Sequence, residues 1–107
     1  MGTNLIRGHL EGLLLAVLLG GPGHGYAVSE RLAVRSGGVL TVPDGSLYPA
    51  LQRLERAGLV ASSWAMAEGR RRRVYELTAS GRQQADASAR EWRSFSGAVD
   101  QVLGGLA

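Results

Sequence analysis

Hydrophobic residues recur at helical spacing over the first part of the chain, from Leu5 to Leu19. Leu15 and Leu19 widen this apolar stripe until nearly every side of the predicted helix is hydrophobic. A helix of that kind is buried on nearly all sides, and a chain this short has few elements left to cover it. The pattern therefore favours a partner subunit packed against this helix. The residues we expect at that contact are Leu10, Leu14 and Val17.

Glycine-rich breaks divide the next part of the chain into short elements. The run at residues 20–23 ends the first helix, and a second predicted helix covers His24–Ser36. Gly37 and Gly38 end this second helix, and Val39–Val42 forms a short β-type run before a third helix. Three short helices with tight glycine-rich connections are typical of a helix-turn-helix domain.

The third helix is predicted within residues 41–59. Pro49 is tolerated in a first turn but not in a helix interior, so the helix should begin at Ser46, or at Asp44 with an irregular first turn. Either residue could cap it, and Gly58 suits the left-handed conformation that ends many helices. The apolar stripe of this helix consists of Leu47, Ala50, Leu51 and Leu54.

The opposite face of the third helix has no acidic residue near its centre. It offers an amide, two guanidinium groups and a phenol, which suit the base edges and phosphates of nucleic acid. The residues on this face are Tyr48, Pro49, Gln52, Arg53 and Arg56. Taken alone, the pattern fits an ordinary surface helix with a solvated polar face equally well.

After Gly58 the hydrophobic period changes from helical to alternating, which predicts a β-hairpin. One strand begins at Val60, the second covers Arg72–Leu77, and Gly69 suits the turn between them. A hairpin that follows a candidate recognition helix and carries a run of arginines is typical of a wing that binds phosphates, although a solvated turn is the alternative. The arginines of this run are Arg70, Arg71, Arg72 and Arg73.

A last helix is predicted from Ala79 to about Leu103, and Thr78 suits its N-cap. From Trp92 onward its apolar residues are spaced three and four apart, as in a coiled-coil seam. We expect this seam to form a dimer; the alternative is a tail helix that folds back on its own core. The residues of the seam are Trp92, Phe95, Val99, Val102 and Leu106.

Composition limits the chain to one domain, or to a small domain with an appended helix, since it has 107 residues of which 45% are hydrophobic. The chain has no cysteine, which excludes disulfides and thiolate chemistry. The net charge is +3 and all twelve basic residues are arginines, the better bidentate partners for phosphate and guanine, although codon bias gives the same usage. No signal peptide is visible and the apolar run Leu13–Leu19 is too short to cross a bilayer, so we expect a cytoplasmic location.

An enzyme is the least favoured class. The chain has two histidines, His9 and His24, and no serine in a nucleophile elbow. His24 falls in a glycine-rich turn, where we expect a structural role. Two histidines without cysteine or clustered carboxylates do not make a convincing metal site. We therefore expect no catalytic residue, no metal and no cofactor.

Four short motifs follow one another in a specific order and spacing. They are G-P-G-H-G-Y (Gly21–Tyr26), D-G-S-L-Y-P-A-L-Q-R-L-E (Asp44–Glu55), G-L-V (Gly58–Val60) and R-R-V-Y-E-L-T-A-S-G (Arg72–Gly81). In this order the motifs resemble the PadR family of bacterial transcriptional regulators, over nearly the whole chain. The chain end resembles the short-tailed subfamily, which has a single C-terminal helix.

The resemblance implies a mainly α fold with a small β-hairpin, in which residues 1–77 form a winged helix-turn-helix DNA-binding domain and residues 78–107 a dimerisation helix. It implies that Ser46, Tyr48 and Pro49 contact the DNA backbone, with Ser46 in place of the family's usual threonine. Gln52 and Arg53 match positions that face the major groove. The arginines at 70–73 match the wing, and Tyr26 supports the domain or touches phosphate.

Family members are mostly repressors that small molecules release from DNA, so the resemblance implies a homodimeric repressor on a pseudo-palindromic operator. A planar or phenolic effector could lie between Trp92 and Phe95 of facing subunits, or these side chains could simply fill the dimer seam. The alternative function is a winged-helix protein-interaction module without specific DNA binding. The arginine-rich wing and the acid-poor helix face argue against that alternative.

Overall fold

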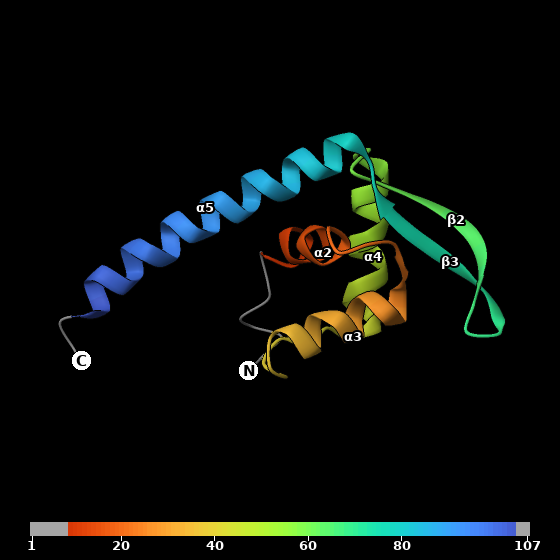
Figure 1. Ribbon diagram of the computed structural model, residues 1–107, viewed down its shortest axis with the longest axis horizontal. Helices are drawn as coiled ribbons and strands as arrows, with labels where there is room; N and C mark the ends of the chain where they lie inside the picture. The colour runs from red at the N-terminus through yellow and green to blue at the C-terminus, as the bar shows by residue number, and fades with distance from the viewer. Residues whose placement is uncertain (1–8, 105–107) are drawn as a thin grey trace.

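The computed structural model describes residues 9–104, in which one long helix projects from a winged domain (Figure 1). The described chain measures 52 × 27 × 21 Å along its principal axes. Its helices are α2 (Leu10–Leu18), α3 (Gly25–Arg35), α4 (Asp44–Arg56) and α5 (Ala79–Leu103). Its strands are β1 (Gly23–His24), β2 (Val60–Ala67) and β3 (Arg70–Leu77). The predicted fold class, mainly α with a small β-hairpin, is confirmed.

The three strands form one antiparallel sheet in the order β1-β3-β2. Val60 pairs with Leu77 at one end of the hairpin, and Ala67 pairs with Arg70 next to the turn. The two turn residues, Glu68 and Gly69, both have positive φ, of 53° and 76°, as the tight primed turns of hairpins require. The predicted turn at Gly69 is therefore confirmed, while β3 begins two residues earlier than expected and β1 was not predicted.

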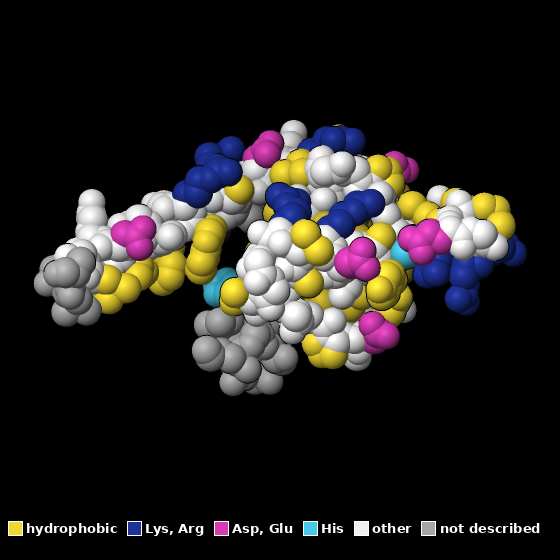
Figure 2. All heavy atoms as spheres, turned by 60° about the horizontal axis from the view of Figure 1, so that its bottom comes forward, with side chains coloured by type: hydrophobic (Ala, Val, Ile, Leu, Met, Phe, Trp, Pro, Cys, Tyr) yellow, Lys and Arg dark blue, Asp and Glu magenta, His cyan; other side chains and the backbone are white. Residues whose placement is uncertain are grey.

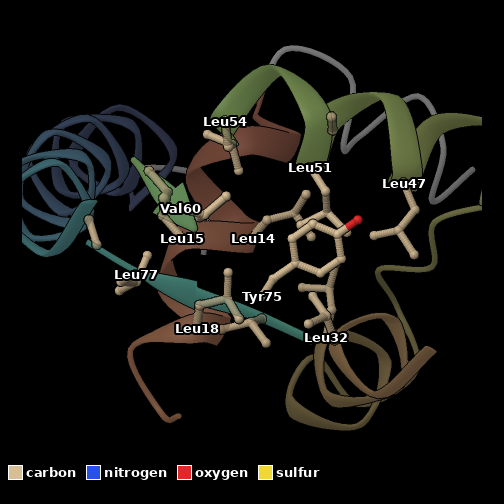
Figure 3. Close-up of a cluster of buried hydrophobic side chains, with 14 of the residues drawn as sticks. Leu14, Leu15, Leu18, Leu32, Leu47, Leu51, Leu54, Val60, Tyr75 and Leu77 are labelled. Carbon is tan, nitrogen blue, oxygen red and sulfur yellow. The ribbon is translucent and has the colours of Figure 1, made fainter. Parts of the chain in front are cut away.

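Large aliphatic side chains from α2, α3, α4 and the sheet meet in one core (Figure 3). Leu14 and Leu15 of α2 and Leu47 and Leu51 of α4 are almost completely buried there. Tyr75 of β3 closes the core on the side of the sheet. Burying a leucine side chain stabilises a fold by about 1.5–3 kcal/mol, so this contact fixes α4 firmly on the domain.

The helix α4 begins at Asp44, one of the two predicted starts, but its capping differs from the prediction. Its N-cap is Pro43, without a side-chain hydrogen bond, so neither Asp44 nor Ser46 caps the helix. The Pro43 carbonyl accepts hydrogen bonds from the amides of Ser46 and Leu47, at 2.9 and 3.0 Å, which satisfies part of the first turn with backbone alone. Pro49 lies inside the helix, beyond the first turn in which a proline is best tolerated.

The end of α4 agrees with the prediction. Gly58 has a φ of +76°, and its amide bonds to the Glu55 carbonyl at 3.0 Å. The next amide, of Leu59, bonds to the Leu54 carbonyl at 3.0 Å, which completes a Schellman motif.

Residues 39–42 do not form the predicted β-type run, because no strand pairs with them in the described chain. Val42 is buried in the core instead, so its apolar character serves packing. The second helix begins at Gly25 rather than at His24, since His24 is its N-cap.

Two of the three dimer contacts predicted on the first helix are wrong. Leu14 and Val17 are 0% and 2% exposed within their own chain, which leaves no surface for a partner. The cover that the sequence seemed to lack comes from α5, which packs along α2 with Ala85 buried. Leu10 stays half-buried and accessible, and the predicted helix start at Leu5 lies outside the described residues.

The long helix α5 has a packed half and a projecting half (Figure 1). Thr78 caps it as predicted, because its Oγ1 accepts a hydrogen bond from the Gly81 amide at 3.0 Å. From Trp92 onward the apolar side chains are largely open to solvent within the chain, with Trp92 51% and Phe95 60% exposed. Leu106, the last predicted seam residue, lies outside the described residues.

Candidate nucleic-acid interface

The helix α4 has one buried and one open face, as its sequence pattern predicts. Its apolar stripe is completely or almost completely buried against the core. Away from the core the helix presents side chains that remain exposed, which leaves them available to a ligand. These side chains are Tyr48, Pro49, Gln52, Arg53 and Arg56.

Tyr48 lies at the contact between α4 and the beginning of α3. A Cβ atom added to Gly25 would stand 2.5 Å from Cε1 and 2.6 Å from the phenol oxygen of Tyr48, so the ring lies directly on the Gly25 backbone. Tyr26, the next residue of α3, is exposed and stacks against His24 with ring centroids 6.4 Å apart. Both candidate tyrosines therefore lie at the beginning of α3.

The phenol of Tyr26 keeps its proton under ordinary conditions. The carboxylate of Glu30, by hydrogen bonding and by its charge, raises the pKa of Tyr26 above its usual value. A neutral phenol can donate a hydrogen bond to a phosphate oxygen, which suits the predicted backbone contact.

Arg53 lies on the side of α4 that faces α2. Its Nε donates a hydrogen bond to Oε1 of Glu11 at 3.2 Å, and both side chains are about half exposed. An exposed ion pair of this kind contributes about 0–1 kcal/mol, so a DNA base or phosphate can replace Glu11 at small cost. Gln52 and Arg56 lie nearer the centre of the open face, and no ion pair to Arg56 occurs within residues 9–104.

The hairpin register distributes the four arginines over two faces of the wing. Arg71 and Arg73 share one face with Trp64, because Trp64 pairs with Arg73 and Met66 with Arg71. Arg70 and Arg72 point to the opposite face. In the view of Figure 2, basic side chains gather along the lower edge of the wing, at the right of the molecule.

Arg73 is fixed at the base of the wing by polar contacts to the end of α4. Its Nε donates to the Ser62 hydroxyl at 2.9 Å, and this hydroxyl donates to the Glu55 carboxylate at 2.7 Å. A guanidinium nitrogen of Arg73 lies 3.8 Å from the same carboxylate. The acidic residue at the margin of the α4 face is thus neutralised by a wing arginine.

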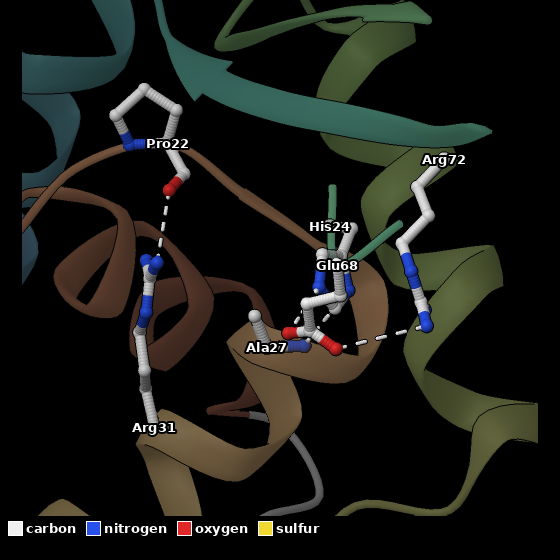
Figure 4. A network of polar contacts seen from close by, with 6 residues as sticks. All are labelled: Pro22, His24, Ala27, Arg31, Glu68 and Arg72. Atoms are coloured by element: carbon white, nitrogen blue, oxygen red, sulfur yellow. Dashed lines mark hydrogen bonds and ion pairs between the residues drawn. The ribbon is translucent and has the colours of Figure 1, made fainter. Parts of the chain in front are cut away.

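Arg72 is the arginine least suited to bind phosphate. Its side chain is only 24% exposed and lies 3.8 Å from the carboxylate of Glu68, while its Nε is buried without a hydrogen-bond partner (Figure 4). No local pattern separates Arg72 from its neighbours, because the difference arises from the fold of the hairpin tip.

A sequence profile and several relatives agree with this geometry. The profile of the transcriptional regulator PadR-like family matches residues 14–87, which is more than half of the chain. The chain belongs to the PadR-like family of transcriptional regulators. A transcriptional regulator of Mycobacterium tuberculosis is 39% identical over 82 residues, which cover 77% of this chain and 71% of the relative.

Solved PadR-like structures share the fold of the described chain. A PadR-like transcriptional regulator from Bacillus cereus is 27% identical with a TM-score of 0.81, and the match covers 94% of this chain and 96% of that one. A PadR family regulator from Eggerthella lenta is 31% identical with a TM-score of 0.77, over 94% of this chain and 87% of its own. The winged helix-turn-helix with one long C-terminal helix is therefore a PadR architecture.

Two residues of this PadR domain, His24 and Glu68, link the wing tip to α3. The Nδ1 of His24 accepts a hydrogen bond from the Ala27 amide at 3.2 Å, so the ring proton is on Nε2. Nε2 then donates to Oε1 of Glu68 at 3.3 Å (Figure 4). His24 is buried, and its position in a glycine-rich turn was the one signal in the sequence for this structural role.

A groove of about 640 Å³ lies between α2 and α5 of the PadR chain. His9 packs edge-on against Trp92 with ring centroids 5.1 Å apart, and Phe95 follows with its centroid 5.8 Å from that of Trp92. Hydrophobic side chains continue along the projecting half of α5 (Figure 2). The predicted effector residues Trp92 and Phe95 therefore line a hollow, and they also belong to the predicted dimer seam.

Neither a membrane span nor a metal cluster occurs in the part of the chain that the structure describes. No helix within residues 9–104 is long and apolar enough to cross a bilayer. No group of three or more histidine, aspartate or glutamate side chains is close enough there to hold a metal ion.

Proposed function

We propose that this chain is a sequence-specific DNA-binding regulator that acts without catalysis in the cytoplasm. One observation carries the proposal: the open face of α4 has no acidic side chain at its centre, and it lies beside a wing that carries four consecutive arginines. DNA-binding helices of this class enter the major groove while positive side chains beside them contact phosphates.

The proposed roles follow from the position of each side chain on this surface. Gln52 and Arg53 read base edges, with Arg56 near them on the open face. Ser46, Tyr48, Pro49 and Tyr26 contact the backbone at the start of the recognition helix. Arg70, Arg71 and Arg73 bind phosphates.

A homodimer is the proposed assembly. The apolar row of α5, which includes Trp92, Phe95, Val99 and Val102, is largely uncovered within residues 9–104, and Leu10 lies accessible on α2. A two-fold axis would place two recognition helices about one helical turn apart on a pseudo-palindromic operator. Bound to a promoter, such a dimer acts as a repressor.

Release by a planar or phenolic small molecule is the proposed regulation. The groove beside Trp92 and Phe95 has the size of a small-molecule site, and its aromatic walls suit a flat ligand. Filling of the dimer seam by the same two side chains is the competing explanation. Planar compounds can be tested for quenching of Trp92 fluorescence in a Trp64→Phe background. Quenching supports the effector site, and its absence favours filling of the seam.

Selection from a pool of random duplex DNA at moderate salt tests the proposed function. Recovery of a palindromic motif supports a dimeric regulator that reads sequence. Repeating the selection with Gln52→Ala should relax the preference at one base pair of each half-site, at a cost of about 1–3 kcal/mol in affinity for the original site. Recovery of unselected sequence, with affinity lost as salt rises, contradicts specific reading and favours a winged-helix protein-interaction module.

A further inference from the structure

Trp64 is an exposed aromatic residue in the middle of the wing. It lies on β2 and is 55% exposed, and Met66, two residues further on the same face, is 71% exposed. Neither side chain contributes to the core, which ends at Val60 and Tyr75. Trp64 is thus an apolar side chain with no packing role in the core, and its neighbours on the wing indicate what it does.

Two arginines lie over the Trp64 ring. The guanidinium carbon of Arg71 is 5.1 Å from the ring centroid, and that of Arg73 is 5.5 Å from it. Both distances fall within the range of about 6 Å at which a cation is attracted to the face of an indole. Because Arg71 and Arg73 are two positions apart on one strand face, their charges repel each other, and the ring between them offsets that repulsion.

The two arginines differ in their other contacts. Arg73 is also held by Ser62 and by the carboxylate of Glu55. For Arg71, no hydrogen bond or ion pair to another side chain occurs within residues 9–104, so Trp64 is what fixes its position there. An unfixed arginine loses much rotational freedom when it binds a phosphate, and a pre-positioned one loses less.

We propose that Trp64 is a positioning residue of the wing, whose indole holds the guanidinium groups of Arg71 and Arg73 ready for the phosphates of duplex DNA. The face that carries these three residues is the continuation of the face on which Tyr75 and Leu77 pack into the core, and Arg73 on this face reaches Glu55 of α4. The held arginines therefore extend the surface of the recognition helix. This inference rests on the proposed DNA-binding function. It adds Trp64, which bears no charge, to the residues on which DNA binding by the wing depends.

The salt dependence of DNA binding tests this role. Trp64→Leu should weaken binding about three- to tenfold, from the loss of cation–π contacts to the arginines. It should also reduce the slope of log K against log salt by up to about 1, although it removes no charge, because a loosened arginine releases fewer counterions. Trp64→Phe keeps an aromatic face, so its affinity and its salt slope should lie between those of the wild type and those of Trp64→Leu. Met66→Leu, on the same exposed face, is the matched control and should change neither.

A double-mutant cycle separates positioning from direct contact. If Trp64 acts through the arginines, Trp64→Leu has little further effect in an Arg71→Ala, Arg73→Ala background. An undiminished effect there, or an unchanged salt slope in Trp64→Leu alone, overturns the proposal in favour of an apolar contact of the indole with DNA. Unchanged thermal unfolding midpoints confirm that the variants are folded.

A measurement on the free protein keeps this result distinct from the proposed function. The side-chain protons of Arg71 and Arg73 should show upfield ring-current shifts by NMR that disappear in Trp64→Leu; their absence in the wild type contradicts the positioning. If the shifts are present but the wild-type protein binds no duplex DNA, the proposed function fails, and with it the proposed purpose of the held arginines.

Discussion

Tyr48 of α4 lies directly on the backbone of Gly25, the first residue of α3. No side chain fits between them, since a Cβ on Gly25 would come within 2.5 Å of the tyrosine ring. This contact sets the distance between the two helices at the end where both approach the proposed DNA surface. The φ of Gly25 is not in the left-handed region, so the backbone conformation does not require glycine here. Glycine is needed because the Tyr48 ring approaches the backbone so closely.

Gly25→Ala should displace the Tyr48 ring. We expect a loss of about 1–3 kcal/mol in unfolding free energy, the usual range for overpacking, together with weaker DNA binding. Tyr48→Ala removes the obstacle, so in that background Gly25→Ala should be neutral or stabilising. Urea unfolding of the two single variants and the double variant measures the coupling. If the loss of unfolding free energy in the double variant equals the sum of the two single losses, the ring does not constrain Gly25.

Arg70 and Arg72 lie on the same face of β3 but should contribute unequally to phosphate binding. Arg70 is exposed, whereas Arg72 is largely covered and paired with Glu68. Arg70→Ala should therefore reduce the slope of log K against log salt by about 0.9, and Arg72→Ala should reduce it by clearly less. Fluorescence anisotropy with a labelled duplex between low and moderate salt measures both slopes. If Arg70→Ala and Arg72→Ala reduce the slope equally, Arg72 must leave Glu68 when DNA binds.

Gly81 fixes the direction in which α5 leaves the domain. A Cβ at this position would collide with the carbonyl oxygen of Leu59, and its next contact, the carbonyl carbon of Leu59, is 2.9 Å away. Because the obstacle is backbone, it cannot rotate aside, and Gly81→Ala should destabilise the fold by about 1–3 kcal/mol or more. Gly97→Ala, in open space within the same helix, should instead stabilise by about 0.5–1 kcal/mol. Thermal unfolding of the two variants gives the comparison.

Hydrophobic periodicity predicted the elements of this fold because each helix and strand buries one continuous stripe. The buried stripe of α4 and the alternation of β2 are readable from the sequence for that reason. Periodicity did not identify which element covers which. It led to Leu14 and Val17 as dimer contacts, because nothing in the first helix reveals that α5 turns back along it.

The candidate site was predictable in its residue types but not in their pairing. The run of arginines indicated a phosphate-binding wing, yet the register decides that Arg71 lies over Trp64 and that Arg72 lies beside Glu68. Glu68 itself carried no signal, since glutamate seldom adopts a positive φ. Such contacts depend on the three-dimensional path of the hairpin, which no local pattern encodes.

Phe95 should be necessary for the proposed dimer. It lies exposed in the apolar row of α5, so Phe95→Asp should leave the folded domain intact while placing a charge in the subunit contact. Light scattering should then give a mass near the 11.3 kDa of one chain instead of twice that value. Gln101→Asp adds the same charge on another side of the helix and should leave the dimer unchanged. A wild-type protein that is itself monomeric at micromolar concentration would contradict the assembly.

The alkaline stability of this protein should report on its tyrosines. The chain has no lysine and no cysteine, and arginine stays charged, so tyrosine is the residue type whose ionisation can change stability in alkaline solution. Burial of Tyr75, followed by the charge of Glu55, raises the pKa of this phenol above 10.0. The folded state therefore holds the Tyr75 proton more tightly than the unfolded state does. The corresponding stability is complete below pH 10 and is lost as the pH rises through the folded-state value.

Tyr75→Phe should make the unfolding free energy less dependent on pH above 10. Urea unfolding at pH 8 and at pH 11 measures this dependence for the wild type and the variant. Tyr48→Phe is the comparison, because the Tyr48 side chain is 39% exposed whereas Tyr75 is only 5% exposed. A variant whose stability falls as steeply as that of the wild type would show that Tyr75 is not shielded from water at the α4–β3 contact.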